Sequence, residues 1–412
     1  MKFEKYHIST AIKKNLSGLE FKRPTDIQYK AIPSIIKGED VLAIAQTGTG
    51  KTAAFAIPII DKIHRIKSSK RSWGIKCIIM VPTRELASQI NSVFNDFSKH
   101  TKVKSFAVYG GVNQDPQIKK LKTGIDVLIA TPGRMFDLIS QKVISVEHVD
   151  TLVLDEADQM LDLGFINDIK SIKKKLVRKH QTLFFSATIN KTIKKLAFSQ
   201  VKSSAIRIQI SPDDPVSKNV THFAMFVEMD DKRFFLRRFI RDHPESRIIV
   251  FVRTRVRAER VVKALERGGI TAVTLHGEKE QKERTKVMNQ FKQGKMNIMV
   301  ATDISARGID IQDINYVINY DLPEKKENYV HRVGRTGRGV NKGIAISFCS
   351  KEEKELLQDI EQFLNKKIET ISISKQEHAN TINLSKEIQS VQDLIKEQEN
   401  WEKTKKKKRR KK

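Results

Sequence analysis

Short apolar runs of three to five residues recur along this chain, and Lys-rich amphipathic stretches separate them. Apolar and polar residues do not alternate strictly within the runs, as expected of strands that are covered on both faces. Such strands in alternation with helices predict a mostly parallel sheet with helices on both faces, so we expect an α/β fold. The runs lie at 41–45, 77–81, 106–109, 127–130, 152–154 and 183–185, and then at 248–252, 272–275, 298–300, 316–319 and 344–348.

The apolar runs form two series, and a turn-rich segment separates them. Residues 209–219 hold two Pro, two Asp and two Ser, a composition typical of a linker. We therefore predict two α/β domains, at 1–208 and 220–370, joined by this linker. The remainder, 371–412, is a polar extension that ends in a Lys/Arg-rich tail. A block of like charges of this kind is expected to be disordered when free.

Composition excludes several classes of protein. With 39% hydrophobic and 30% charged residues, the chain is typical of a globular protein rather than a disordered one. No apolar run approaches the ~20 residues of a bilayer-spanning helix, and the N-terminus lacks the apolar stretch of a secretory signal. The two cysteines, Cys77 and Cys349, lie inside apolar runs. We therefore expect a reducing, cytoplasmic location without a disulfide framework or a zinc site.

The net charge of +29 indicates a polyanionic partner. The last ten residues carry nine of the positive charges, so the excess is not confined to the tail. Nucleic acid is the usual partner of so basic a protein, and a solubilising surface excess is the alternative. Charge alone does not separate RNA from other polyanions.

The segment 45–52 reads AQTGTGKT and lies between an apolar run and a helical one, which is the setting of a phosphate-binding loop. Its two glycines let backbone N–H groups turn toward phosphate oxygens, and the following helix N-terminus favours an anion. Lys51 would reach the β- and γ-phosphates, and the Thr52 hydroxyl would bind Mg²⁺. The strict pattern begins with Gly, whereas this chain has Ala45. An ordinary Gly-rich turn is the alternative.

A pair of acidic residues follows a later apolar run, at the end of an expected strand. Asp155 there can hold Mg²⁺, and Glu156 is placed to orient or deprotonate an attacking water. Taken alone, the pair is equally typical of a solvated turn. Together with the loop at 45–52, it indicates an ATPase or a GTPase.

Residues 155–158 read Asp-Glu-Ala-Asp, and the chain resembles the DEAD-box RNA helicases of superfamily 2 over about residues 3–340. The resemblance implies two tandem RecA-like domains, with ATP and Mg²⁺ as cofactors and RNA as partner. At 20–28 it implies adenine recognition, in which Gln28 pairs with N6 and N7 and Phe21 stacks on the ring with Phe3 behind it. This would select ATP over GTP. The nucleotide-binding residues so implied are Phe21, Gln28, Ala45, Thr47, Gly48, Thr49, Gly50, Lys51, Thr52 and Asp310.

The resemblance also implies RNA-binding loops after several expected strands. Hydroxyls, arginines and helix N-termini in these loops suit contacts with phosphates. The residues so implied are Pro82, Thr83, Arg84, Gly111, Thr131 and Arg134 in the first domain and Thr254, Gly277, Gln281, Arg284 and Thr302 in the second. Just before Gln281 the chain has Glu where family members often have Ser or Thr, which puts one minor contact in doubt.

The segment 331–338 reads HRVGRTGR, and in the family its arginines reach the γ-phosphate from the second domain. Arginine fingers of this kind are typically worth about 10³–10⁵ in rate. The catalytic residues implied are Lys51, Asp155, Glu156, Arg335 and Arg338. The residues implied to couple the state of ATP to strand separation are Asp158, Ser186, Thr188 and His331.

The resemblance implies an ATP-dependent RNA helicase that binds ATP and RNA cooperatively, closes its two domains and locally separates RNA strands. Hydrolysis to ADP and phosphate would then release the RNA. Three alternatives remain: an ATP-gated RNA clamp, a DNA-directed motor and a catalytically inactive scaffold. The short flanks and basic tail resemble the bacterial RhlE-like branch, although a basic tail is also found as a nuclear address. We expect a monomer that associates with ribonucleoproteins or with ribosome assembly.

Overall fold

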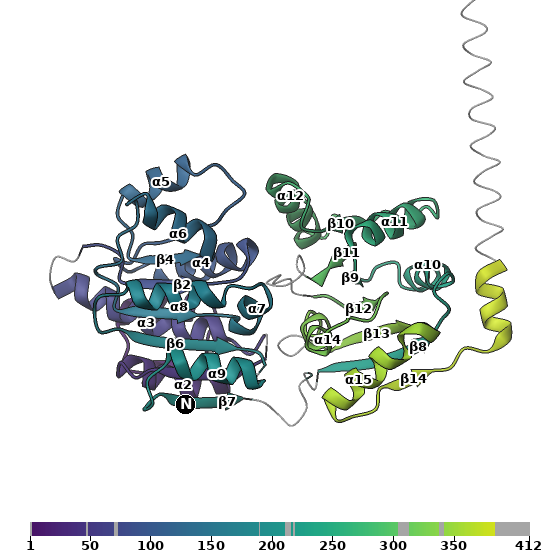
Figure 1. Cartoon of the computed structure of the whole chain (residues 1–412), viewed down its shortest axis with the longest axis horizontal. Helices are drawn as coiled ribbons and strands as arrows, with labels where there is room; N and C mark the ends of the chain where they lie inside the picture. Colours follow the sequence, from purple (N-terminus) through teal and green to yellow (C-terminus); the bar gives the residue numbers. More distant parts are fainter. Residues whose placement is uncertain are drawn as a thin grey trace, which may run out of the picture. The chain divides into compact units, whose positions relative to one another are not determined.

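The computed structural model describes residues 2–46, 48–69, 73–188, 190–210, 216, 219–303, 313–337 and 342–383. The chain divides near residue 215 into two compact units, and each unit is built on one seven-stranded sheet (Figure 1). Every pair of neighbouring strands in the two sheets is parallel. The α/β fold with parallel sheets that the sequence predicts is therefore confirmed.

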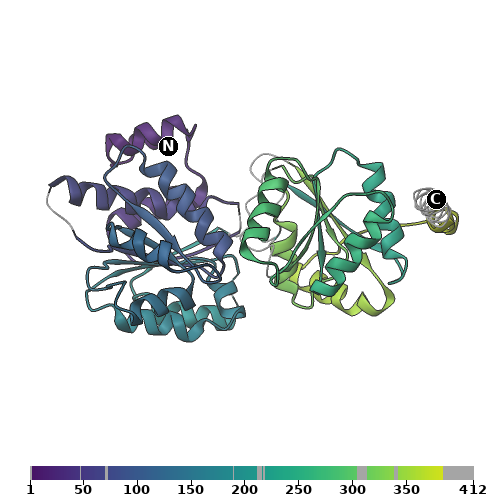
Figure 2. The same ribbon diagram turned by 90° about the horizontal axis from the view of Figure 1, so that it is seen from above.

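The first sheet has the strand order β3-β4-β2-β5-β6-β1-β7, and helices cover both of its faces (Figure 2). Its strands are β1 (Val41–Ala45), β2 (Cys77–Met80), β3 (Ser105–Val108), β4 (Val127–Ala130), β5 (Thr151–Leu154), β6 (Gln181–Ser186) and β7 (Ile206–Ile210). Its helices are η1 (Phe3–Lys5), α1 (Thr10–Gly18), α2 (Asp26–Ile36), α3 (Lys51–Ser69), α4 (Arg84–Ser98), α5 (Asp115–Lys122), α6 (Pro132–Ser140), α7 (Ala157–Asp162), α8 (Ile166–Lys175) and α9 (Lys191–Gln200).

Strand β1 shows why the first sheet needs helices on both faces. All five of its residues are buried, and successive side chains of a strand point to opposite faces. Val41, Ala43 and Ala45 pack into the apolar cluster on one face. Leu42 and Ile44 pack into the cluster on the other. Water is excluded from both sets only because helices lie over both faces.

Helix α3 is held against the sheet by aromatic packing. The ring of Phe55 in α3 lies 5.2 Å from that of Phe185 in β6 and 6.3 Å from that of Phe94 in α4, measured between centroids. All three side chains are buried. This contact fixes the helix whose first turn follows the loop at 45–52.

The second sheet has the order β10-β11-β9-β12-β13-β8-β14, which is the order of the first sheet with every strand number raised by seven. The two units therefore share one topology. Its strands are β8 (Val220–Phe226), β9 (Ile248–Val252), β10 (Val273–Leu275), β11 (Ile298–Thr302), β12 (Tyr316–Asn319), β13 (Gly343–Cys349) and β14 (Glu369–Ile371). The helices with it are α10 (Lys232–Asp242), α11 (Arg255–Glu266), α12 (Gln281–Lys292), α14 (Lys326–Val333), η2 (Lys351–Glu353) and α15 (Lys354–Leu364).

Two of the domain boundaries expected from the sequence differ from the ends of these elements. Strand β7 pairs with β1 as far as Ile210, so the first residues of the expected linker belong to the first sheet. Residues 375–383 form a helix, and its Thr381 accepts a hydrogen bond from Nη1 of Arg238 in α10 at 2.6 Å. The second unit thus extends past residue 370, and the expected Lys/Arg tail lies outside the described residues. Within the described ranges, no helix has the length and apolar character that a bilayer span requires.

Candidate active site

The phosphate loop, residues 45–52, connects the end of β1 to the start of α3. Gly48 and Gly50 have φ angles of +83° and +92°, which glycine adopts without strain. A Cβ atom on Gly50 would also lie 2.4 Å from Nε2 of Gln28. The backbone therefore turns at these glycines as a phosphate-binding loop requires, and the N-terminus of α3 follows directly. Thr47 lies outside the described residues.

Lys51 is the first residue of α3 and its side chain is buried. Its Nζ donates a hydrogen bond to the carbonyl oxygen of Ala45 at 2.7 Å, so the side chain lies back across the loop. The hydroxyl of Thr49 closes a turn by donating to a carbonyl oxygen within the loop at 2.8 Å. Thr52 is half-buried in the first turn of α3.

Asp155 and Glu156 follow β5, which only β6 separates from β1 in the sheet. The N–H of Asp155 donates to the carbonyl oxygen of Met80 at 3.1 Å. Glu156 has a left-handed backbone, with φ +50° and ψ +49°, and its N–H donates to Oδ1 of Asp155 at 3.0 Å. Strain of about 1–2 kcal/mol accompanies this conformation in a residue with a Cβ. Such strain clusters at catalytic positions.

The environment of Asp155 fits a divalent cation. Burial raises the pKa of this carboxyl to about 7; the Lys51 ammonium beside it opposes the rise, and the Glu156 and Asp158 carboxylates add to it. The neighbouring groups of the protein therefore compensate the negative charge of an ionised Asp155 only in part. Among the described residues, no group of three or more His, Cys, Asp or Glu could hold a metal ion. The donor set suits Mg²⁺, which commonly binds through one or two carboxylates together with water and phosphate oxygens.

Asp158 connects the acidic segment to the loop after β6. Its Oδ2 accepts hydrogen bonds from the N–H groups of Ala187 and Thr188 at 3.1 and 2.9 Å, and from the Thr188 hydroxyl at 2.9 Å. The Ser186 hydroxyl donates to the Thr188 carbonyl oxygen at 2.8 Å. Bonds to an ionised acceptor are roughly twice as strong as neutral ones. Asp158, Ser186 and Thr188 thus form one network between β5 and β6.

Gln28, in the first turn of α2, is tied to the phosphate loop. Its Oε1 accepts from the N–H of Thr25 at 3.0 Å, and its Nε2 donates to the carbonyl oxygen of Gly50 at 3.2 Å. The amide is thereby held in one orientation, with one donor and one acceptor position left. Adenine presents the complementary N6 donor and N7 acceptor. The geometry is compatible with the expected adenine contact, which stays a prediction.

Phe21 lies beside this helix in an aromatic cluster. Its ring centroid is 6.3 Å from that of Phe3 and 5.3 Å, edge-to-face, from that of Phe97. Phe3 is only 3% exposed and packs against Phe21; stacking of Phe21 on adenine, with Phe3 behind it, stays a prediction. Phe21 itself is half-buried, which leaves part of its ring available for stacking.

The loops expected to bind RNA in the first unit follow β2, β3 and β4, which are neighbours in the sheet. Pro82 and Thr83 lie in the short loop between β2 and α4, and Thr83 caps α4 through its Oγ1, which accepts a backbone hydrogen bond at 3.3 Å. The guanidinium of Arg84 lies against Gly111, where an added Cβ would come 2.0 Å from Nη1. The loops after β2 and β3 are therefore in direct contact.

The loop after β4 joins the same group. Thr131 precedes α6, and in that helix Nη2 of Arg134 donates to the carbonyl oxygen of Val112 at 3.0 Å. Val112 follows Gly111, so Arg134 reaches the loop after β3. All six residues expected to bind RNA in this unit thus lie on three adjoining loops or in the first turn of the helices that follow them.

The second unit repeats this arrangement. Thr302 is the last residue of β11, Gly277 lies just past the end of β10, and Thr254 follows β9. These three strands are neighbours in the sheet. Thr254 caps α11 with its hydroxyl, which accepts a backbone N–H at 3.2 Å. Its φ and ψ are −126° and 153°, against −129° and 156° for Thr83. The two threonines therefore occupy equivalent places in the two units.

The other described residues expected to act in the second unit lie on α12, on α14 or just after α14. Gln281 begins α12, and Arg284 is buried in its first turn. His331 lies near the end of α14 and Arg335 just after it; Nε of Arg335 donates to the His331 carbonyl oxygen at 3.0 Å. Two further residues lie outside the described part of the chain, Arg338 and Asp310.

Two models of protein families match the chain. The model described as DEAD/DEAH box helicase matches residues 25–196, and the model described as helicase conserved C-terminal domain matches residues 231–340. The chain belongs to the DEAD/DEAH box helicase family. The resemblance carried by residues 155–158 is thus confirmed for both units of this helicase.

Known relatives agree with this assignment. The helicase is 38% identical to the ATP-dependent RNA helicase DeaD of Buchnera aphidicola over 95% of its own length and 64% of that protein. It is 36% identical to the ATP-dependent RNA helicase CshA of Listeria monocytogenes over 96% of its length and 75% of that protein. These relatives do not test the RhlE-like assignment, which stays a prediction.

Solved structures of helicases share the fold. The chain matches S. cerevisiae Dbp5 bound to RNA and ADP BeF3 with a TM-score of 0.82 and 27% identity, covering 94% of this chain and 99% of that one. It matches the DEAD-box helicase Mss116 bound to ssRNA and UDP-BeF with a TM-score of 0.83 and 27% identity, covering 92% and 81%. The expectation of two tandem RecA-like domains is confirmed.

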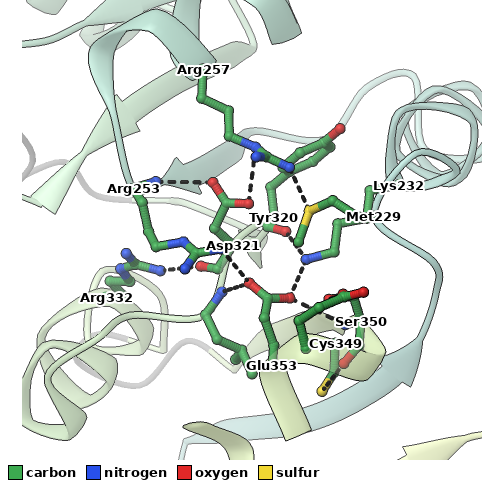
Figure 3. A network of polar contacts seen from close by, with 12 residues as sticks. Met229, Lys232, Arg253, Arg257, Tyr320, Asp321, Arg332, Cys349, Ser350 and Glu353 are labelled. Carbon is green, nitrogen blue, oxygen red and sulfur yellow. Dashed lines mark hydrogen bonds and ion pairs between the residues drawn. The ribbon is translucent and has the colours of Figure 1, made fainter.

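One buried ionic network of this helicase was not expected from its sequence. Glu353, in η2, accepts hydrogen bonds from Nη2 of Arg253 and the N–H of Leu322, both at 3.2 Å. It also pairs with Lys232 at the start of α10 (Figure 3). The Glu353 and Lys232 side chains are 1% and 0% exposed. Burial lowers the pKa of Lys232, although Glu353 beside it opposes the shift.

The network continues through Arg332 of α14. Its guanidinium donates to Oδ2 of Asp303 at 2.9 Å and to the carbonyl oxygen of Asp321 at 2.6 Å. The Asp321 carboxylate accepts from the N–H of Arg253 at 3.0 Å and pairs with Arg257 at 3.1 Å. The network therefore ties α14 to the loops after β9 and β11, which carry expected RNA contacts.

We predict that Glu353→Gln destabilises the second unit by about 3–5 kcal/mol, because the buried Lys232 loses the carboxylate that pairs with it. Urea unfolding followed by circular dichroism measures the change. The double variant Lys232→Met/Glu353→Gln serves as the control and should recover part of the loss, since it leaves no buried ammonium without its carboxylate. A Glu353→Gln variant as stable as the parent protein would contradict this account.

Proposed function

We propose that this protein is an ATP-dependent RNA helicase in which the binding of ATP and RNA closes the two units. Closure would separate RNA strands locally, and hydrolysis of ATP to ADP and phosphate would reset the enzyme. Coupling between two ligands that favour one state is reciprocal and is commonly worth about 1–3 kcal/mol.

The strand order of the first sheet carries the proposal. The loops expected to hold RNA follow β3, β4 and β2, and the phosphate loop follows β1. Strands β5 and β6 lie between these two sets, and Asp158 bonds their loops together. A rearrangement of residues 155–158 that accompanies ATP binding or hydrolysis would therefore also move the loop after β6. The names of the relatives, and the RNA and nucleotides in the similar structures, support the same function.

The residues around the phosphate loop suit hydrolysis. Lys51 would hold the β- and γ-phosphates, and Glu156 would orient or deprotonate the attacking water. Mg²⁺, bound beside Thr52 and Asp155 together with ATP, would neutralise charge on the phosphates. Arg335 and Arg338 of the second unit would complete the site only when the units close. Hydrolysis should therefore depend on RNA.

The mode of RNA binding follows from the type of contact. Hydroxyls, arginines and helix N-termini hold phosphates without reading bases, so binding should show little sequence preference and a strong dependence on salt. Discrimination of RNA from DNA needs contacts with the 2′-hydroxyl. We further infer a monomeric, cytoplasmic enzyme that acts on ribonucleoproteins or in ribosome assembly. The two cysteines, both buried and unbridged, are compatible with a reducing compartment.

We predict that single-stranded RNA, but not DNA of equal length, strongly stimulates steady-state ATP hydrolysis. Glu156→Gln should lower the stimulated rate by about 10²–10⁴-fold, because the water loses its general base. Equal rates with and without RNA would contradict closure of the units as the step that completes the site.

A release assay separates the helicase from an ATP-gated clamp. A short RNA duplex with a single-stranded extension is incubated with ATP, and the free strand is measured. With RNA in excess over the enzyme, a helicase releases the strand at a steady-state rate that Glu156→Gln lowers, because the enzyme is no longer reset, whereas a clamp stays bound to an intact duplex.

We predict that Gly111→Ala weakens RNA binding by about tenfold, equivalent to the loss of about one charge-assisted hydrogen bond. The added Cβ would displace the Arg84 guanidinium, which lies 2.0 Å from its position. Gly124→Ala is the control, because Gly124 has nearly the same φ, +77° against +73°, but nothing within 4 Å of the added atom. If Gly111→Ala binds RNA as tightly as Gly124→Ala does, displacement of the Arg84 guanidinium does not weaken RNA binding and the prediction is wrong.

We predict that the basic tail tethers RNA. Removal of residues 403–412, which carry nine positive charges, should weaken RNA binding most at low salt. Turnover at saturating RNA should stay nearly unchanged, because the tail contributes no expected catalytic residue. Collapse of the saturated rate would refute the tether.

A further inference from the structure

Five arginines gather where α10 packs against α11 in the second unit. Arg233, Arg237 and Arg241 follow one another at intervals of four along α10, so they share one face of that helix. Arg260 belongs to α11, and Arg267 directly follows it. Three of the five, Arg233, Arg260 and Arg267, line one pocket of about 400 Å³.

Arg237 is the buried member of this arginine cluster. Its side chain is only 5% exposed, and its Nε and Nη2 atoms are buried without a hydrogen-bond partner. The guanidinium lies against Gly268, where an added Cβ would come 2.5 Å from Nε. Burial lowers the pKa of Arg237, and the charges of Arg241, Arg233 and Arg267 lower it further. A buried cation surrounded by like charges is unfavourable unless an anion joins it.

The pocket connects the arginine cluster to an expected RNA contact. Thr254, which caps α11, lines the same pocket as Arg233 and Arg260. Guanidinium groups bind phosphate oxygens in a bidentate manner. A strand held at Thr254 would therefore bring its next phosphates toward a group of arginines.

We propose that the arginine cluster binds backbone phosphates of the RNA strand that continues past Thr254. This inference rests on the proposed function, and it adds a second RNA-binding segment outside the loops that follow β9, β10 and β11.

An extended strand fits this pocket better than a free nucleotide does. The connection from β8 to α10, which corresponds to the phosphate loop of the first unit, reads Val-Glu-Met-Asp-Asp at 227–231 and contains no glycine. Asp230 also lines the pocket, and a compact polyphosphate would place several negative charges near that carboxylate. Phosphates spaced along a strand can each meet one arginine instead.

The test compares the affinity for two RNAs in the presence of a non-hydrolysable ATP analogue. One RNA is short and spans only the expected contact loops; the other carries a single-stranded extension at both ends. Arg260→Gln and Arg237→Met should each weaken binding of the extended RNA by about tenfold and leave the short RNA unchanged. The salt dependence of binding should fall by about one unit of slope for each lost phosphate contact.

Lys263→Gln is the matched control, because Lys263 is an exposed cation on α11 that does not line the pocket. It should bind both RNAs as the parent protein does. Gly268→Ala keeps every charge but pushes on the Arg237 guanidinium, so it should reproduce the loss for the extended RNA. Equal affinities of Arg260→Gln, Gly268→Ala and Lys263→Gln for the extended RNA would overturn the proposal.

Thermal unfolding in phosphate-free buffer provides a second readout. Because the buried guanidinium has unpartnered nitrogens, Arg237→Met should unfold at the same temperature as the parent protein or at a higher one. A clear drop would mean that Arg237 is satisfied within the fold and would overturn the anion site. A raised melting temperature with unchanged RNA binding would refute RNA as the ligand and direct attention to an acidic protein segment.

Failure of the broader function is distinguishable from failure of this inference. If the parent protein does not bind the short RNA, the proposed helicase function fails. If the parent protein binds the short RNA and the extended RNA with the same affinity, only the second RNA-binding segment is refuted.

Discussion

All strands within each sheet of this protein run in one direction, and this constraint decides where its functional loops lie. The carboxyl ends of parallel strands meet at one edge of a sheet. Loops that are far apart in the sequence therefore share that edge, and strand order alone decides which of them are neighbours. In the first unit, this order places the loops proposed to bind RNA at one end, the phosphate loop toward the other, and the loops joined by Asp158 between them.

The second unit repeats the strand order but not the chemistry. Lys232 begins α10 as Lys51 begins α3, yet its ammonium is paired with the buried Glu353. Without a glycine between β8 and α10, the backbone there cannot easily make the left-handed turns that point N–H groups at a phosphate. The two units therefore share one topology but differ at this position. The first unit has a loop suited to a nucleotide, whereas the second has a buried ion pair between Lys232 and Glu353.

Contiguous patterns were sufficient to predict the fold class and the glycine-containing turn between β1 and α3, because each depends on a few successive residues. The pairing of Lys232 with Glu353 could not be predicted in this way, since the two residues are 121 positions apart and no motif marks either. The contact of Arg84 with Gly111 likewise exists only because β2, β4 and β3 are neighbours. The linker was expected to begin at residue 209, because residues 209 and 210 are recognised as part of a strand only through their pairing with β1.

The region matched by the DEAD/DEAH box helicase model starts at residue 25. The residues that pack around Phe21 and α4 start earlier in the chain. Phe3 packs on Phe21, and Phe21 packs on Phe97 in α4. A fragment that began at residue 25 would keep the whole phosphate loop and the Gln28–Gly50 hydrogen bond. It would nevertheless expose Phe97 and other apolar residues that the first helices cover. The first unit therefore needs residues that precede the region matched by the family model in order to bury its apolar core.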